Sequence, residues 1–158
     1  MTSTAKAYGG KKHAGKLSYD PDAWATPQKL FEGLNQEFGF TLDVAAAFDN
    51  AKCRQYYWEN GLGKDWTADA GNGTCFCNPP YSEVATWLEK AYQESQRGAR
   101  VVCLVKSDTS TRWFREYYEL ADDVRFLPRI QFVPPPGYGR KVGSPNMGHA
   151  LLIFGKFK

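Results

Sequence analysis

The sequence has no long apolar run. No stretch of its 158 residues approaches the roughly 18 consecutive apolar residues that a membrane span requires. The lysine-bearing N-terminus has no apolar segment behind it, so a secretory leader is not expected either. We therefore expect a cytoplasmic protein without a membrane partner.

Histidine is scarce, and the cysteines are not spaced for metal binding. The four cysteines form no C-x-x-C pair, and the two histidines, His13 and His149, lie far from them in sequence. Because zinc sites need clustered Cys and His ligands, we expect no metal site. Cys75, Cys77 and Cys103 fall within apolar runs, which is typical of buried reduced thiols and again indicates the cytoplasm. Neither histidine is expected to be catalytic.

Acidic residues are missing from both ends of the chain. Residues 1–19 carry four lysines and residues 124–158 carry six basic residues, whereas all 17 acidic residues lie between these segments. Basic ends suit a protein that grips a polyanion, because Lys and Arg neutralise phosphates with release of counterions. For residues 1–19, a disordered tail with incidental charge is an equally good interpretation. Residues 20–158 have the length and apolar content of a single domain.

Three helices are expected from the spacing of apolar residues. The first has Thr26 as its cap and Pro27 at its first position, and it ends at Gly39. The second is capped by Ser82 and stops at Gly98. A third opens at residues 109–110 and continues to residue 120.

Apolar runs between these helices predict strands. They cover residues 40–44, 74–77, 100–106 and 124–127, followed by a closing hairpin of residues 130–133 and 150–157. Residues 45–73 are expected to be rich in loops. The alternation predicts an α/β fold with a doubly wound, mostly parallel sheet, helices on both faces and a C-terminal antiparallel hairpin.

The tetrapeptide Asn78-Pro79-Pro80-Tyr81 follows the short run of residues 74–77. The amide oxygen of Asn78 and the carbonyl of the next proline can each accept an N–H of a planar amine, which frees the nitrogen lone pair for attack on a methyl donor. Two successive prolines stiffen the turn, and Tyr81 offers a flat face for stacking a base. The alternative is an ordinary Pro-Pro turn with a buried tyrosine.

Candidate site segments lie at the ends of three of the predicted strands. They are residues 43–46, 78–81 and 107–109. Because ligands of open α/β sheets bind at the carboxyl ends of the strands, we expect these segments to meet at one edge of the sheet.

An ordered set of short motifs makes the chain similar to a known family. The set comprises residues 24–27, 38–46, 50–53, 65–66, 78–81, 111–113 and 150–154. It resembles the small phage-type DNA adenine N6-methyltransferases, which use S-adenosylmethionine. The resemblance covers about residues 22–155. It implies a Rossmann-like sheet of the class I methyltransferase type, a metal-free reaction, a flipped adenine in double-stranded DNA as acceptor, and a phage or prophage origin in a bacterial host.

The resemblance also assigns roles around the methyl donor. Trp24, Thr26 and Pro27 look like the segment beside the methionine portion of the donor, and Asp43 looks like the acidic residue after the first strand. Small residues at positions 45 and 46, Ala45 and Ala46, let the backbone approach the ligand. The Gly-x-Gly of larger methyltransferases does not follow this strand. Asp65 and Trp66 resemble contacts of the donor's adenine, although a turn former and a core residue are the ordinary interpretations.

Candidates for DNA contact lie beside the tetrapeptide and in the proline-rich segment near the C-terminus. They are Arg112, Arg129, Tyr138, Arg140, Lys141 and Asn146. Arg and Asn suit guanine and adenine edges, whereas contact with phosphate is the more common role of an arginine.

Other activities fit the same turn. An RNA adenine or a protein glutamine offers a similar amine, and the basic ends favour nucleic acid over protein without separating DNA from RNA. A non-catalytic nucleic-acid-binding module on this fold, or a small-molecule methyltransferase, remains a further alternative.

Overall fold

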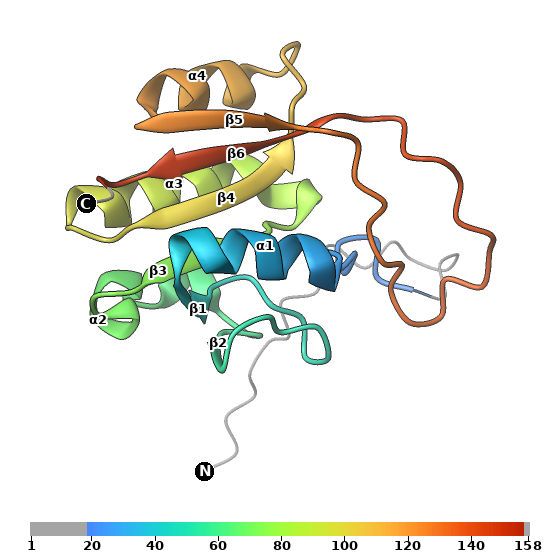
Figure 1. Ribbon diagram of the computed structural model, residues 1–158, viewed down its shortest axis with the longest axis horizontal. Coiled ribbons are helices and arrows are strands. Elements are labelled where there is room, and N and C mark those ends of the chain that lie inside the picture. The colour runs from blue at the N-terminus through green and yellow to red at the C-terminus, as the bar shows by residue number, and fades with distance from the viewer. Residues whose placement is uncertain (1–18, 157–158) are drawn as a thin grey trace.

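The computed structural model describes residues 19–156, which form one six-stranded sheet flanked by helices (Figure 1). The strands are β1 (Phe40–Asp43), β2 (Gln55–Tyr56), β3 (Thr74–Cys77), β4 (Val101–Lys106), β5 (Asp123–Leu127) and β6 (His149–Phe154). The helices are α1 (Gln28–Phe38), α2 (Trp66–Ala70), α3 (Val84–Gln96) and α4 (Arg112–Leu120), with short 3-10 turns at Gly61–Gly63 and Tyr81–Glu83.

The strand order is β2-β1-β3-β4-β6-β5. β6 runs antiparallel to both of its neighbours, and the pairs among β2, β1, β3 and β4 are parallel. From β1 the chain moves outward to β2, whereas from β3 it moves the other way to β4. The carboxyl ends of β1 and β3 therefore flank a point where the connections diverge, which is where open α/β sheets bind ligands.

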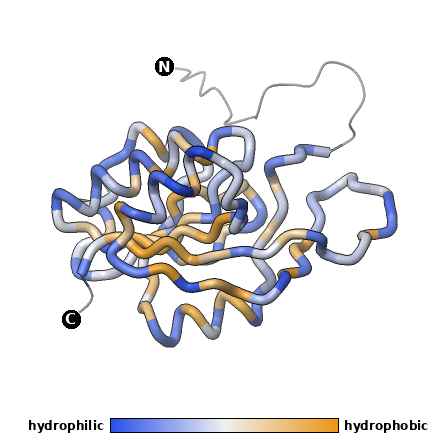
Figure 2. The backbone as a smooth tube through the Cα atoms, turned by 90° about the horizontal axis from the view of Figure 1, so that it is seen from above, coloured by the Kyte–Doolittle hydropathy of each residue, from blue (hydrophilic) through white to orange (hydrophobic). Residues whose placement is uncertain are grey.

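Alternation of side chains along the strands supplies both faces of the sheet with a core. On one face, β-strand residues such as Leu42, Cys103 and Leu152 pack against α2, α3 and α4. On the other, Phe76 and Leu104 are among those that pack against α1. All residues of β3 and β6 are buried, and Figure 2 shows hydrophobic residues concentrated along the central strands. The expected mixed α/β sheet with helices on both faces is confirmed.

Helix boundaries agree with the expectations more closely than the caps do. α1 ends at Gly39, whose φ of 62° is the left-handed conformation that glycine adopts without steric cost. Thr26 does not cap α1: the N-cap residue is Pro27, which was expected at the first helical position, and Thr26 Oγ1 makes no hydrogen bond to any described residue. Ser82 does not cap α3 either: its hydroxyl donates to Asp22, 2.5 Å away, across the turn.

The C-terminal antiparallel pair forms between different segments than expected. β5 pairs with β6, and residues 128–148 make a long excursion between them (Figure 1). Residues 130–133 add only an isolated bridge from Val133 to Ala25. The three prolines that follow, at positions 134–136, lack N–H donors and cannot continue a ladder. β2 and α2 lie in the stretch that was expected to be loop-rich.

The expected basic tail, residues 1–19, lies outside the described residues except for Tyr19. The ring of Tyr19 contacts that of Tyr138 edge-on, with centroids 4.9 Å apart. Within residues 19–156, no helix is both long and apolar enough to cross a membrane. Cys53, Cys75, Cys77 and Cys103 are free thiols. Burial raises the pKa of Cys75 to about 12, in keeping with a protonated core thiol.

Two glycine-to-alanine changes should have opposite effects on folding. A Cβ at Gly61 would lie 2.4 Å from the carbonyl oxygen of Val44 and 2.8 Å from the Trp87 ring, whereas no described atom lies within 4 Å of one at Gly33 in α1. Gly61→Ala should lower the free energy of unfolding by about 1–3 kcal/mol through overpacking. Gly33→Ala should raise it by about 0.5–1 kcal/mol through helix propensity. Urea unfolding followed by circular dichroism measures both, and equal effects would contradict the packing described at Gly61.

Candidate active site

A cavity of about 270 Å³ lies at the carboxyl ends of β1 and β3, and we call it the strand-end cavity. Its lining combines the segment before α1, the loop after β1 and the turn after β3. Seven of the residues expected at a site take part: Trp24, Thr26, Asp43, Ala45, Ala46, Asn78 and Pro80. Pro27, the N-cap residue of α1, does not line it.

Asp43 sits at the end of β1 with only 2% of its surface exposed. Its two carboxylate oxygens accept backbone N–H groups at the two ends of the following loop, from Ala45 at 3.3 Å and Lys52 at 2.9 Å. Burial raises the pKa of Asp43 from 3.8 to about 6, and these hydrogen bonds oppose the rise. The carboxylate thus fixes the loop and keeps acceptor capacity toward the cavity.

Thr26 carries a buried hydroxyl that is unsatisfied. Its residue is 1% exposed, and Oγ1 has no hydrogen-bond partner among residues 19–156. Because Thr26 lines the strand-end cavity, this hydroxyl is available to hydrogen-bond a ligand there.

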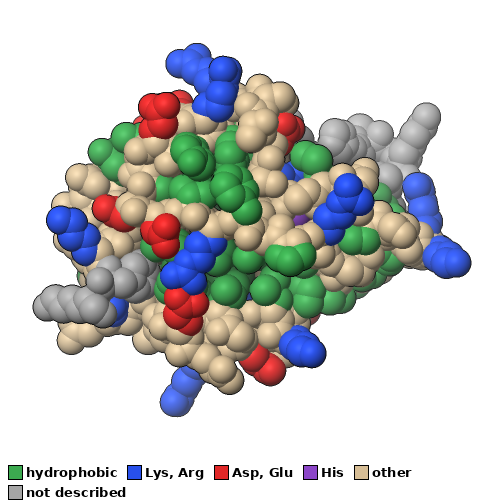
Figure 3. Space-filling model, turned by 45° about the horizontal axis from the view of Figure 1, so that its top comes forward, with side chains coloured by type: hydrophobic (Ala, Val, Ile, Leu, Met, Phe, Trp, Pro, Cys, Tyr) green, Lys and Arg blue, Asp and Glu red, His purple; other side chains and the backbone are tan. Residues whose placement is uncertain are grey.

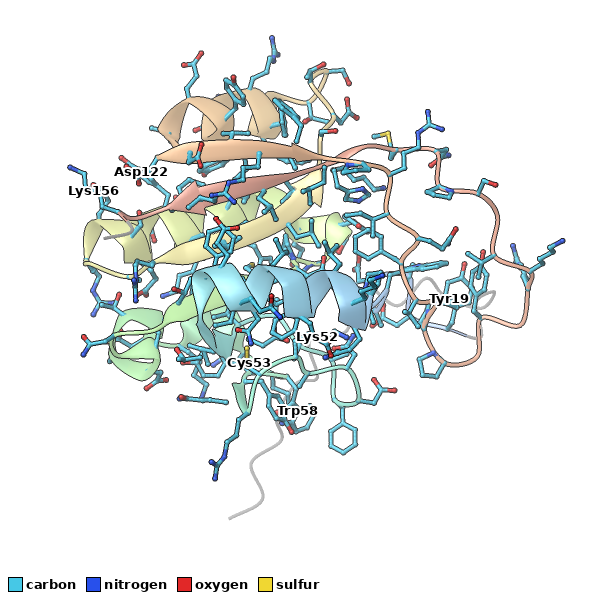
Figure 4. All side chains as sticks on the ribbon, in the orientation of Figure 1. Tyr19, Lys52, Cys53, Trp58, Asp122 and Lys156 are labelled. Atoms are coloured by element: carbon cyan, nitrogen blue, oxygen red, sulfur yellow. The ribbon has the colours of Figure 1, made fainter. Side chains whose placement is uncertain are left out.

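Aromatic residues after β1 form a part of the wall that sequence reasoning missed. Phe48 and Trp58 line the cavity, and their rings meet edge-on with centroids 5.4 Å apart. They are 75% and 44% exposed, which is unusual for an adjacent pair of large apolar side chains. Trp58 and Lys52 lie on the β2 side of the sheet (Figure 4). The signal in the sequence was a bulky ring, Phe48, directly after three small residues at positions 45–47.

Asn78, in the turn after β3, has a hydrogen-bond partner that the sequence did not predict. Asn78 Nδ2 donates to the carbonyl oxygen of Trp24 at 3.3 Å. Because this bond occupies the amide nitrogen, the amide oxygen is left as an acceptor. Pro79 is buried, and Pro80 has φ −56° and leads directly into the 3-10 turn that begins with Tyr81. The acceptors of the turn are therefore held by two prolines and by a contact with a segment 54 residues away.

Tyr81 faces a second, larger cavity of about 950 Å³, which we call the loop cavity because residues 130–147 form much of its wall. Trp24 and Asp22 line both cavities. The two cavities therefore share a wall beside Asn78, so a group bound in one can lie next to a group bound in the other.

Known proteins share sequence similarity with this chain. The family described as "DNA N-6-adenine-methyltransferase (Dam)" matches residues 14–158. This chain belongs to that family. A "DNA N-6-adenine-methyltransferase" of Escherichia phage T1 is 30% identical over 177 residues, covering 99% of this chain and 73% of the phage protein. One of Haemophilus phage HP1 is 32% identical over 142 residues, covering 85% of this chain and 79% of the relative.

A shorter relative matches part of the chain. The "Putative methyltransferase YfdM" of Escherichia coli K12 is 43% identical over 75 residues, which cover 44% of this chain and 82% of that protein. The resemblance to phage-type adenine methyltransferases inferred from the short motifs is confirmed. Membership of a methyltransferase family implies, in general, that S-adenosylmethionine is the cofactor.

Asp65 and Trp66, which the family resemblance placed beside the donor's adenine, make local contacts in the free protein. Asp65 is exposed, caps α2 by accepting from Ala68 N and pairs with Arg97 at 2.9 Å. Trp66 is fully buried, and its Nε1 donates to the carbonyl of Gly61 at 2.7 Å. Neither lines the strand-end cavity. Their local roles, a helix cap and a core ring, account for both.

The third polar strand end also has a local role. Asp108 accepts from the backbone and hydroxyl of Ser110, and these bonds lower its pKa. Thr111 then caps α4 through Phe114 N. Of the three strand ends, two meet in a cavity of this Dam-family protein and the third makes the turn into a helix.

The residues expected to contact DNA are spread over one end of the molecule. Arg129, Arg140 and Lys141 are exposed on the excursion of residues 128–148, where Figure 3 shows basic side chains at the right. Asn146 and Tyr138 line the loop cavity, and the ring of Tyr138 contacts Trp24 with centroids 5.0 Å apart. Arg112 is exposed at the start of α4 and lines neither cavity.

Removing the hydroxyl of Thr26 should not destabilise the free protein. Thr26→Val keeps the shape and deletes an unsatisfied group, so the free energy of unfolding should stay constant or rise. Thr74→Val is the matched control, since that buried hydroxyl donates to Phe38 O at 2.8 Å. It should lower the free energy of unfolding by about 1–2 kcal/mol. Chemical denaturation compares the two, and an equal loss in both would show that Thr26 has a partner in the free protein.

Proposed function

We propose that this protein transfers a methyl group from S-adenosylmethionine to the N6 amino group of adenine in double-stranded DNA. The observation that carries the proposal is the 78–81 turn between two adjoining cavities, with its amide oriented by Trp24 O. Membership of the DNA N-6-adenine-methyltransferase family and the names of the two phage relatives support the substrate. We also propose that the sheet is the Rossmann-like arrangement of class I methyltransferases, with its single reversed strand β6.

The strand-end cavity is suited to the methyl donor. S-adenosylmethionine supplies an electrophilic methyl on a sulfonium, so its leaving group needs no activation. Asp43 would accept hydrogen bonds from the ammonium or the ribose hydroxyls of S-adenosylmethionine. Thr26 would form a hydrogen bond to the same molecule through its unpaired hydroxyl. Phe48 and Trp58 would supply the flat apolar contacts that the resemblance had assigned to Asp65 and Trp66. Trp24 and Ala45 complete this part of the wall.

The 78–81 turn would activate the adenine amine. The amide oxygen of Asn78 and the carbonyl of Pro79 would each accept one N–H, which draws the nitrogen lone pair out of the ring. The protein then contributes mainly alignment, because the acceptors are fixed before the substrate arrives. No strong base is required, since the proton is lost from an acidic ammonium after transfer.

The loop cavity would receive the adenine. An amino group inside a paired, stacked helix cannot reach the turn, so the base would be flipped out of the duplex. Unstacking costs a few kcal/mol, and stacking on Tyr81 offsets about 1–3 kcal/mol of it. The cavity is large enough for a base together with its sugar.

The excursion of residues 128–148 would hold the DNA around the flipped base. Arg140 and Lys141 are exposed cations suited to phosphates, and Asn146 lies at the loop cavity within reach of a base. Arg129, whose Nη1 donates to Pro145 O at 3.5 Å, would hold the excursion in shape as well as meet DNA. Tyr138 would support Trp24. Arg112 would contact the backbone from α4.

Replacing Asn78 should slow transfer strongly and keep donor binding. Asn78→Ala removes one acceptor of the amine, and the loss of one preorganised polar contact lowers kcat by about 100-fold or more. Asn72→Ala is the control, because this exposed residue precedes β3 at the opposite end of the strand. Labelled S-adenosylmethionine is incubated with duplex DNA, single-stranded DNA or structured RNA, and the modified base is identified after digestion.

Three outcomes of this assay would contradict the proposed function. They are label on cytosine N4, label on RNA alone, and transfer by Asn78→Ala equal to that of Asn72→Ala. The dissociation constant of the methyl donor is measured for Asn78→Ala as well. A rise of more than about tenfold, equivalent to about 1.4 kcal/mol, would show that Asn78 binds the methyl donor and does not activate the amine.

Donor affinity should depend on the protonation of Asp43. Its pKa of about 6 in the folded protein exceeds the ordinary 3.8, so the free protein loses stability as the pH rises through this window. Only the ionised form attracts a cationic donor, so affinity should change in the opposite sense and fall about tenfold between pH 7 and pH 5. Calorimetry measures this. Asp43→Asn should bind the methyl donor more weakly at pH 7, and its affinity should not change between pH 7 and pH 5. If its affinity changes with pH as that of the wild type does, Asp43 is not part of the site.

A further inference from the structure

Tyr81 contacts the last residue of one strand and the first residue of the neighbouring strand. Lys106 closes β4 and His149 opens β6, and these two residues face each other in the antiparallel register. Both line the loop cavity. The side chain of each contacts Tyr81 in a different way, so the ring is held by a cross-strand pair that lies outside the 78–81 turn.

His149 holds the hydroxyl of Tyr81. Its Nε2 lies 3.3 Å from Tyr81 Oη, and its own ring packs against Phe132 with centroids 4.8 Å apart. His149 is 4% exposed, so its position is fixed by the core. Burial, assisted by the charge of Lys106, lowers the pKa of His149 to about 4. The imidazole is therefore neutral at neutral pH, and the phenol donates to Nε2 in one neutral tautomer and accepts from it in the other.

Lys106 covers one face of the Tyr81 ring. Its Nζ lies 4.3 Å from the ring centroid, a distance at which an ammonium is attracted to the aromatic face. A flat ligand cannot occupy that face at the same time. The ring thus offers its opposite face, and both contacts restrict the rotation that a tyrosine on a surface turn would otherwise have.

We propose that His149 and Lys106 are positioning residues that fix the ring of Tyr81, so that the flipped base stacks on the face opposite Lys106. The inference rests on the proposed function, in which Tyr81 is the platform for adenine. It goes beyond the 78–81 turn, because it extends the base site to the ends of β4 and β6. A preformed platform lowers the ordering cost that the base would otherwise meet on entry.

The hydrogen bond is tested first without substrate. The nitrogen-15 chemical shifts of the His149 ring are compared in wild-type protein and in Tyr81→Phe, which keeps the ring and removes the hydroxyl. A shift confined to the Nε2 signal supports the contact. Unchanged signals overturn it, whatever reaction the protein catalyses, so this result is separate from the proposed function.

The role of the bond is tested in the reaction with duplex DNA. Tyr81→Phe and His149→Phe should each raise KM for DNA about three- to tenfold, the usual worth of one hydrogen bond. The double variant should be no worse than either single one, because both delete the same interaction. His149→Gln, which can still reach the hydroxyl, should recover part of the loss. The dissociation constant of the donor should stay unchanged in all of them.

Fluorescence of 2-aminopurine at the target position reports the flipped base directly. The proposal expects less of the flipped state in His149→Phe and recovery in His149→Gln. Multiplied losses in the double variant, or equal losses in His149→Phe and His149→Gln, would show that His149 has only a structural role. If wild-type protein methylates no DNA adenine, the proposed function fails first.

Lys106 needs a test that separates the ring from phosphate. Lys106→Met keeps the length of the side chain and removes the charge, so the ring loses its cation and KM for DNA should rise. A lysine bound to phosphate contributes about one unit to the slope of log affinity against log salt concentration. The proposal expects this slope to be the same in Lys106→Met and wild type. A slope that falls by about one would assign Lys106 to the DNA backbone and overturn its role at Tyr81.

Discussion

β1 and β3 run parallel and side by side, and the chain leaves their carboxyl ends in opposite directions. The register pairs Asp43 with Phe76. Asn78 follows Phe76 by two residues, so Asp43 and Asn78 lie near each other at the same edge of the sheet. Because the connections diverge from this point, the ends of the two strands can form a cavity. The buried faces of the strands anchor it, because Leu42, Phe76 and Cys77 have almost no exposed surface. Both polar groups are therefore fixed by the sheet, whose core a single substitution on the surface does not shift.

Trp24 joins this sheet edge to the rest of the molecule. Its carbonyl accepts from Asn78, its ring contacts Tyr138, and its side chain lines both cavities. The neighbouring Asp22 accepts from Ser82 on the far side of the 78–81 turn. A segment that precedes α1 thus crosses the turn and braces it on two sides. This bracing explains why the turn needs more than prolines: the prolines restrict its backbone, and Trp24 selects the orientation of the amide.

The sequence was a good guide wherever a local pattern and the tertiary structure agreed. Apolar periodicity located α1, α3, α4 and the buried strands, and the 78–81 turn and Asp43 lie together at the sheet edge as expected. Pairing of distant segments carries no local pattern, so β6 was assigned the wrong partner. The sequence did not predict β2 for the same reason, because a strand of two residues has no periodic pattern of its own. Asp65 and Trp66 followed a family pattern, but the helix cap and core position decide where these side chains lie.

The departures from ordinary folding rules gather at the candidate site. Thr26 keeps an unsatisfied hydroxyl, Asp43 is a buried carboxyl with a raised pKa, and Phe48 and Trp58 expose large rings. Each feature is unfavourable in the free protein and would be relieved by a ligand with the matching group: an acceptor or donor, a cation, and a flat apolar surface. These three requirements together describe a molecule that is cationic, polar at one end and aromatic at another. A Pro-Pro turn on a merely structural scaffold would have no need of any of them, so the wall of the strand-end cavity argues for a bound donor independently of the tetrapeptide.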